Sequence, residues 1–304
     1  MSRKNRHRMS VGMLYLITVL ITMAIVGTFA YFIFKSVVFS PDVSANRYSH
    51  SILKTRYQPS EENSQNFLFI GVENSELNVL SLVRIDAFKS EVLCVPLPLE
   101  SCVQVNTKAS TLECFYEGDG LATLLSGVEI LLGIPVSRYC VINNSDLNSI
   151  VSLLGGAQYP FPGDMYFQNP ETGEVTDYKL TQTDCVLSGD DIRKIMTYPD
   201  YPSGREYNLS VTGTLTALLV NTFSDKARED SGLIDEMFLQ LMNVSETNLK
   251  QEDYDFNRTA FDYILTHIYN PATFLIPRGV WETPDRFVMS DDFLNSFREY
   301  FNFN

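Results

Sequence analysis

The chain has 304 residues, of which 45% are hydrophobic, and its 23 basic and 37 acidic side chains give a net charge of −14. Five of the basic residues and none of the acidic ones lie within residues 1–35, so the remainder holds 18 basic and 37 acidic residues, a net charge of −19. Such a field repels nucleic acid and disfavours a DNA-binding function. Three histidines are too few for a histidine metal cluster, and they argue against a Ser-His-Asp hydrolase.

The first feature of the chain is an uncharged apolar segment at residues 11–34. About 20 apolar residues in a helix span a bilayer core of ~30 Å, and the basic residues within 1–10 keep that tail cytoplasmic. We therefore predict a single-pass anchor in the cell membrane with the bulk of the chain outside. A cleaved signal peptide is the alternative, but its apolar region is usually ~7–15 residues and ends at small side chains. This segment ends with Tyr31, Phe32 and Phe34.

Residues 35–64 mix Ser, Asn, Pro and charged side chains without sustained periodicity, which is typical of a stalk. We expect one folded extracellular domain over residues 65–304, and its length is enough to bury a substantial core.

The domain begins with β-type runs, and helical patterns follow. Residues 66–72, 79–85 and 91–95 predict strands, the last two joined as a hairpin through 86–90. The apolar spacing of residues 121–132 predicts a buried helix.

The alternation of strand and helix then continues. A strand is expected at 138–142, and the polar cluster that starts at Asn143 caps a helix that ends near Leu154, before two glycines. Another helix should begin after Ser188, with acidic residues in its first turn. The remaining predicted elements are helices at about 206–223, 233–242, 257–269 and 291–301 and a strand at 273–276. We predict an α/β fold with a mixed central sheet flanked by helices.

Five cysteines occur without any C-x-x-C pair, so neither a zinc site nor a dense disulfide framework is indicated. Cys102 and Cys114 either close a loop as a disulfide or act as small apolar side chains. The sequence leaves both open.

Several segments in this order resemble the LytR-CpsA-Psr family of cell-wall glycopolymer ligases. They are FLFIGVENSELNVLSLVRID (67–86), VLCVPLPLES (92–101), VEILLGIPVSRYCVINNSDLNSIVSLLGGAQY (128–159), VLSGDDIRKIMTY (186–198) and SGREYNLSVTGTLTALL (203–219). The resemblance covers residues 65–225, and the C-terminal part, 226–304, also has segments similar to those of many members.

The resemblance implies an enzyme of the bacterial envelope that transfers a glycopolymer phosphate from a polyprenyl pyrophosphate to peptidoglycan. Its arginines clamp the pyrophosphate and its aspartates hold Mg²⁺, because guanidinium forks suit phosphate and carboxylates suit a hard cation.

This chain departs from the family at those positions. The family's R-S-D-T places its arginine on Glu76 and its aspartate on Asn78, and the arginine of I-P-R-D-T falls on Leu99. Two later family arginines fall on Thr197 and Asn208. Each charged hydrogen bond to phosphate contributes ~1.5–3 kcal/mol, so their joint loss should abolish most of the catalysis.

Four residues remain as candidate ligand-binding groups: Arg205, Glu100, Arg84 and Arg193. Arg205 and Glu100 match family positions, whereas Arg84 lies within a predicted strand and Arg193 at an unmatched position. The alternative for Arg205 is a side chain that covers its turn or pairs with a nearby acid, and for Glu100 a solvated loop residue. We assign no catalytic residue and no metal ligand.

Two functions of different classes follow. The first is a membrane-anchored protein that binds a polyprenyl-linked glycopolymer or peptidoglycan, or that scaffolds wall assembly with other envelope proteins, and that has no cofactor. The second is a divergent, active phosphotransferase that requires Mg²⁺. A sensor is a third possibility, but a tail of about ten residues has no room for a signalling domain.

Overall fold

The computed structural model describes residues 60–159, 164–168, 173, 175–178, 186–201 and 204–301. The predicted tail, membrane span and nearly all of the stalk lie outside these residues and remain predictions. Within the described part, no helix combines the length and the hydropathy that crossing a bilayer requires.

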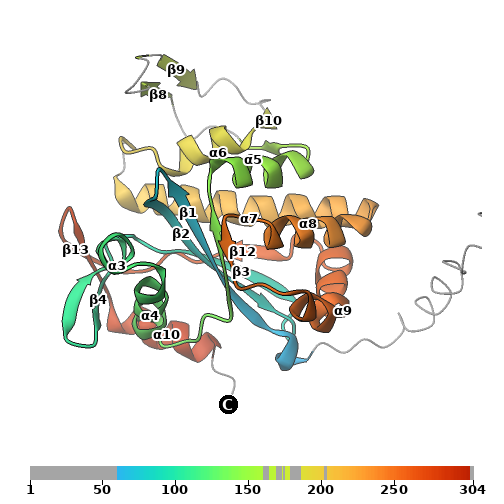
Figure 1. Cartoon of the computed structure of the whole chain (residues 1–304), viewed down its shortest axis with the longest axis horizontal. Coiled ribbons are helices and arrows are strands. Elements are labelled where there is room, and N and C mark those ends of the chain that lie inside the picture. The colour runs from blue at the N-terminus through green and yellow to red at the C-terminus, as the bar shows by residue number, and fades with distance from the viewer. Residues whose placement is uncertain are drawn as a thin grey trace, which may run out of the picture. The chain divides into compact units, whose positions relative to one another are not determined.

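A mixed six-stranded sheet forms the centre of the described domain (Figure 1). Its order is β11 (Glu246–Thr247), β6 (Arg138–Ile142), β1 (Gln65–Glu73), β2 (Glu76–Asp86), β3 (Glu91–Pro96) and β12 (Ala272–Phe274). Strands β1, β2 and β3 are antiparallel neighbours, while β6 runs parallel to β1 and β12 parallel to β3. The carboxyl ends of β1, β3, β6 and β12 therefore lie at one edge of the sheet.

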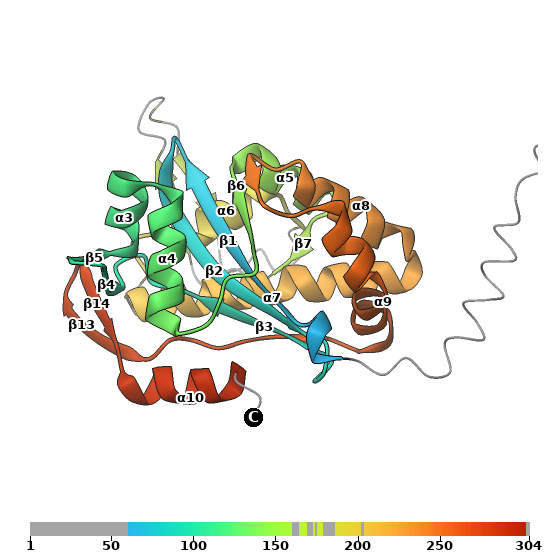
Figure 2. The ribbon, with the colours of Figure 1, turned by 60° about the horizontal axis from the view of Figure 1, so that its bottom comes forward.

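Helices cover both faces of this sheet (Figure 2). One face carries α3 (Leu112–Asp119), α4 (Leu121–Leu132) and α10 (Asp291–Phe301). The other carries α5 (Asn144–Leu153), α6 (Gly189–Met196), α7 (Arg205–Glu229), α8 (Gly232–Met242) and α9 (Gln251–His267). The mixed α/β architecture predicted from the sequence is confirmed.

Smaller pairs of strands surround the sheet. They are β4 (Cys102–Val105) with β5 (Lys108–Thr111), β13 (Gly279–Thr283) with β14 (Arg286–Met289), β7 (Ala157–Gln158) with β10 (Val186–Leu187), and β8 (Met165–Gln168) with β9 (Val175–Tyr178). A short 3₁₀ helix, η1 (Glu61–Asn63), precedes β1.

The tight core lies on the α3, α4 and α10 side of the sheet. Leu68 and Ile70 of β1 and Leu80 and Leu82 of β2 are at most 2% exposed and belong to it, together with Phe297 of α10. These positions alternate along each strand because successive side chains point to opposite faces. The intervening residues of β1 and β2 face the other set of helices.

Local signals located most elements correctly. The structure confirms, to within three residues at either end, the predicted strands at 66–72, 79–85, 91–95 and 138–142 and the helices at 121–132, 233–242 and 291–301. The caps are also confirmed, since Asn143 and Ser188 both form capping boxes, with Asp146 and Asp191.

Other boundaries were wrong, and some elements were missed. Helix α7 continues six residues beyond the predicted end at 223, and α9 begins at Gln251, where Asp253 caps the first turn, instead of at 257. Strand β12 begins at Ala272 and ends at Phe274, short of the predicted 276. Helix α3 and the hairpins β4–β5 and β13–β14 were not predicted.

A buried ion-pair network joins the two ends of the described domain. The Arg84 side chain, on β2, donates to Asp86 at 3.1 Å, to Asn66 at 3.2 Å and to Glu61 of η1 at 2.8 Å. Its guanidinium also lies over the Phe301 ring at the end of α10, 4.9 Å from the centroid. Arg84 and Asp86 are 5% and 0% exposed.

We predict that Arg84→Met lowers the free energy of unfolding by about 3 kcal/mol, because it removes the closer of the two cations beside the buried Asp86 carboxylate and leaves only Lys89, at 3.7 Å. Urea unfolding of the full chain measures this. Arg286→Met is the matched control, since the pair of Arg286 with Glu282 is exposed on both sides and should contribute less than about 1 kcal/mol. Equal losses for the two variants would contradict the assignment.

Candidate functional site

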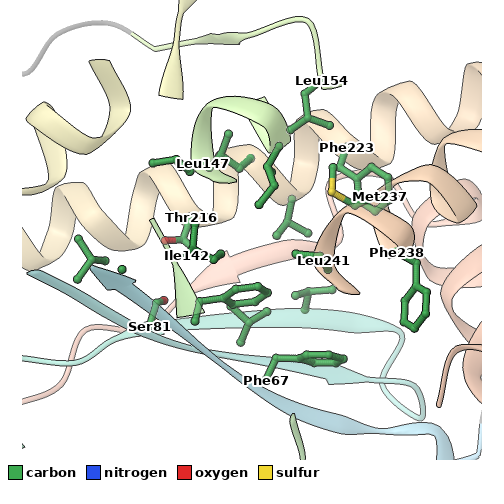
Figure 3. A pocket seen from close by; sticks show the side chains of 18 of the residues that line it. Phe67, Ser81, Ile142, Leu147, Leu154, Thr216, Phe223, Met237, Phe238 and Leu241 are labelled. Atoms are coloured by element: carbon green, nitrogen blue, oxygen red, sulfur yellow. The ribbon is translucent and has the colours of Figure 1, made fainter. Parts of the chain in front are cut away.

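A large apolar pocket lies between the second face of the sheet and helices α5, α7, α8 and α9 (Figure 3). Its volume is about 260 Å³. Leucine and phenylalanine side chains fill the first face of the sheet, whereas this face leaves an open apolar space, the kind of concave surface that ligands use.

Alternate residues of two strands form the floor of the pocket. Phe67, Phe69 and Gly71 come from β1, and Val79, Ser81, Val83 and Ile85 from β2. Phe69 is paired with Ser81, and Gly71 with Val79, so each row across the two strands contributes neighbouring side chains.

Helical repeats form the opposite wall. Leu147, Ile150 and Leu154 follow one another at spacings of three and four residues, so they share one face of α5 and its C-terminus. The other helices add Thr216, Leu219, Val220 and Phe223 from α7, Ile234, Met237, Phe238 and Leu241 from α8, and Tyr254, Phe261, Ile264 and Leu265 from α9. The wall is therefore almost wholly hydrocarbon.

One end of the pocket is polar. We call this the polar end and define it by the lining residues Asn78, Asn143, Asn144 and Arg193. Asn143 and Asn144 follow the carboxyl end of β6, and Asn78 lies on β2 beside Gly71, near the carboxyl end of β1. Ligands of open α/β sheets usually bind at this edge.

The cation of the polar end is already neutralised. Arg193 Nη1 donates to Glu73 Oε2 at 2.6 Å, and Asn144 Nδ2 donates to Glu73 Oε1 at 3.0 Å. The Arg193 Nε atom is buried and has no hydrogen-bond partner. Arg193 thus keeps one donor free although its charge is paired.

Helices α8 and α9 are tied together beside the pocket. Asp235 accepts from Arg258 Nη2 at 3.0 Å and from the hydroxyl of Tyr254, a pocket residue. Burial raises the pKa of Asp235, but the hydrogen bonds from Arg258 and Tyr254 outweigh it and leave that pKa below its usual value. Burial and the bond to Asp235 raise the pKa of Tyr254 to about 12.

A second polar site surrounds Arg205 at the start of α7. Its guanidinium bonds to Glu100, lies 3.8 Å from Asp285 and stacks 5.0 Å from the centre of the Trp281 ring. Burial raises the pKa of Glu113 nearby, Glu100 raises it further, and Arg205 lowers it. The carboxylates here outnumber the cation.

The structure separates the four candidate residues predicted from the sequence. Arg205 and Glu100 are brought together as an ion pair, and Arg193 reaches the pocket. Arg84 lies in the buried network with η1 and α10, where its guanidinium contacts Asp86, Asn66 and Glu61.

The positions where the family arginines and aspartate fall have other contacts. Asn78 lines the pocket, Glu76 is exposed at the start of β2, and Leu99 packs against the core. The Thr197 hydroxyl donates to Arg193 O at 3.0 Å, and Asn208 Nδ2 donates to Met196 O at 2.7 Å. These last two residues fix the end of α6.

The described cysteines are free thiols, so the structure contains no bond between Cys102 and Cys114. Burial raises the pKa of the Cys94 thiol to about 12 and that of Cys140 to about 11, which makes both poor nucleophiles. Across the described ranges, no group of three or more His, Cys, Asp or Glu side chains is placed to hold a metal ion.

Sequence reasoning did not identify most of the residues that line the pocket, Ser81 among them. The signal was present, since Ser81 interrupts an otherwise apolar set of alternate positions from Val79 to Ile85. Its meaning depended on which face of the sheet is open, and that is a tertiary property.

Comparison with solved structures identifies the architecture. A protein from Eubacterium siraeum described as a transcription regulator matches with a TM-score of 0.71 at 18% identity, over 82% of this chain and 95% of that one. B. subtilis TagV matches with a TM-score of 0.64 at 16% identity, over 81% and 97% of the two chains. The LytR-Csp2A-Psr enzyme from Actinomyces oris matches with a TM-score of 0.61 at 14% identity, over 80% and 93%.

The chain has the LytR-CpsA-Psr fold. No family model and no curated protein matches the sequence itself. At these identities the comparison shows the fold, and the LytR-CpsA-Psr resemblance noted in the sequence is confirmed at that level.

We predict that Glu73→Gln raises the affinity of the full chain for an alkyl phosphate about fivefold, because it removes a negative charge next to Arg193. Competition binding with dodecyl phosphate measures this. Glu299→Gln makes the same charge change at an exposed position of α10, on the other face of the sheet, and should have no effect. A wild-type affinity for Glu73→Gln would show that the pair does not limit anion binding.

Proposed function

We propose that this protein is a cell-envelope relative of the glycopolymer ligases that holds the apolar chain of a lipid-linked glycopolymer without transferring the glycopolymer. The observation that carries the proposal is the apolar pocket with a polar end whose one cation is paired with Glu73. The LytR-CpsA-Psr fold supports the envelope context, and the resemblance implies a polyprenyl carrier.

The pocket suits a hydrocarbon chain for a simple reason. Binding buries apolar surface on both partners, at ~25 cal/mol per Å², and nearly all wall atoms are apolar. A sugar or a peptide would have to bury polar groups against Phe67, Phe223 and Leu241, at a cost of several kcal/mol.

The polar groups argue against pyrophosphate transfer. A transferred phosphoryl group requires several unpaired cations and a metal ion aimed at it. Arg193 and Arg205 each pair with a carboxylate, and the positions of the family arginines hold Glu76, Leu99, Thr197 and Asn208. The decay of this centre is part of our proposal, as is the absence of catalysis.

The predicted anchor at 11–34 completes the proposal. With the N-terminus in the cytoplasm, residues 65–304 lie outside the membrane, where envelope glycopolymers, peptidoglycan and other envelope proteins are the available partners. The net negative charge disfavours nucleic acid as a ligand.

A divergent phosphotransferase is the second candidate, and the buried unpartnered Nε of Arg193 favours it. In that reaction Arg193 and Arg205 would hold the phosphates, and Mg²⁺ would neutralise the charge that develops on them. The donor set is poor, since Asn78 supplies an amide where the family has an aspartate.

The proposal predicts that a side chain that fills the pocket weakens lipid binding. Leu219→Trp adds bulk inside the pocket and should weaken binding of a fluorescent polyprenyl phosphate at least tenfold in the full chain held in amphipol. Leu239→Trp on the exposed side of α8, 51% exposed, is the control and should bind as the wild type does. Equal binding by both variants would exclude the pocket as the lipid site.

The two candidate functions predict opposite results in a turnover assay: a binding protein releases no polyprenyl phosphate, and a transferase does. Mixed with a polyprenyl-pyrophosphate saccharide, a peptidoglycan acceptor and Mg²⁺, the full chain should bind the lipid and release no polyprenyl phosphate above background. Thin-layer chromatography measures the release. Metal-dependent release that Arg205→Ala abolishes would establish the transferase instead.

A further inference from the structure

Exposed aromatic side chains gather at one end of the described domain. Phe88, in the turn between β2 and β3, is 59% exposed, Phe256 of α9 is 61% exposed, and Tyr269, just after α9, is 74% exposed. Phenylalanine is usually buried, and a group of exposed apolar side chains often marks a contact with a partner or a membrane. We call these three residues the aromatic end.

Hydrogen bonds place the aromatic end beside the first described residues of the chain. The side-chain amide of Asn63, in η1, donates to Phe256 O at 3.5 Å, and the Ala87 amide donates to Ser64 Oγ at 3.0 Å. After α9, the carbonyl of Pro271 accepts from the start of β3 at 2.8 Å. Both ribbon views show α9 beside the blue start of the described domain (Figures 1 and 2).

This end of the domain is also where the chain arrives from the predicted anchor. The predicted span ends at residue 34 and the described domain begins at Ser60, so residues 35–59 join them. A chain of ~25 residues reaches at most about 90 Å, and a flexible one spans roughly 25–30 Å. A domain tethered at this distance meets the bilayer at a high effective concentration, so a few aromatic side chains are sufficient for docking.

We infer that the aromatic end docks in the interface of the bilayer, with Phe88, Phe256 and Tyr269 at the boundary between head groups and acyl chains. The inference rests on the predicted anchor at 11–34 and goes beyond the proposed function. At this boundary the phenyl rings leave water, while the Tyr269 hydroxyl stays among the head groups, a position that tyrosine favours in membrane proteins.

The charges at the aromatic end determine what kind of docking this is. Glu62, Glu252 and Asp255 are exposed there, whereas Lys89 and Arg228 each pair with an acidic side chain. Anionic head groups are therefore not attracted to this surface. Docking depends on the removal of apolar surface from water, and salt should not weaken it.

The apolar pocket extends to the same edge of the sheet. Phe67 at the start of β1, Ile85 at the end of β2 and Val92 at the start of β3 line it there, opposite Phe261 and Leu265 of α9. The polar end of the pocket lies at the other edge. A lipid with its head group at the polar end thus directs its hydrocarbon chain toward the docked edge.

Tryptophan fluorescence tests the docking, because the chain has one tryptophan, Trp281, which lies on β13 beside Arg205. The full chain is reconstituted in phosphatidylcholine vesicles with and without bromine on the acyl chains. Phe88→Trp and Phe256→Trp should each lose at least about half of the emission that the new tryptophan adds, since interfacial side chains reach ~5–10 Å into the bilayer. The loss should be the same at ~0.5 M salt.

The matched control lies at the opposite edge of the sheet. Val280→Trp replaces a side chain of β13 that is 65% exposed, and neither it nor the wild type should be quenched. Equal quenching at position 280, or none at 88 and 256 in vesicle-bound chain, overturns the inference and leaves the anchor and the proposed function intact. Emission of Phe256→Trp that is blue-shifted without lipid would assign this surface to a protein contact and overturns it too. A chain that does not associate with vesicles removes both anchor and docking.

Discussion

The two-residue alternation along β1 and β2 is the constraint on which the rest of the domain depends. It sends Leu68, Ile70, Leu80 and Leu82 into a close-packed core with α3, α4 and α10, and it sends the intervening side chains toward a space that the other helices do not fill. The face packed against α3, α4 and α10 supplies a close-packed core, and the opposite face carries the pocket. A shift of one residue in register would exchange the two sets, place Ser81 in the core and destroy the pocket at once.

At the end of the sheet where the pocket opens, Arg193 and Arg205 are each paired with a carboxylate. Glu73 pairs with Arg193, and Glu100 and Asp285 lie beside Arg205. A site built for phosphate leaves guanidinium groups unpaired until the anion arrives, because an internal carboxylate competes for the same hydrogen bonds. In this arrangement an anion would have to compete with Glu73 for Arg193 and with Glu100 for Arg205.

Local sequence signals were sufficient for most of the fold and for little of the site. The helix at 121–132 and the caps at Asn143 and Ser188 are determined by neighbouring residues, and the sequence predicted them. Hairpins β4–β5 and β13–β14 depend on packing against the core, and their short strands carry no strong pattern. The pair of Arg193 with Glu73 joins residues 120 positions apart, and that of Arg205 with Glu100 joins residues 105 positions apart, so no local pattern reports either.

An open pocket also has an energetic consequence for the domain. An apolar pocket deprives its lining side chains of the close contacts that a filled core provides, so it lowers the stability of the domain relative to a filled core. A protein retains such a cost where a ligand offsets it, because a ligand that binds only the folded state stabilises that state. The buried network around Arg84, which joins η1 to the end of α10, stabilises the domain without occupying the pocket. Those contacts lie on residues other than the pocket wall, so this part of the domain's stability does not depend on what the pocket holds.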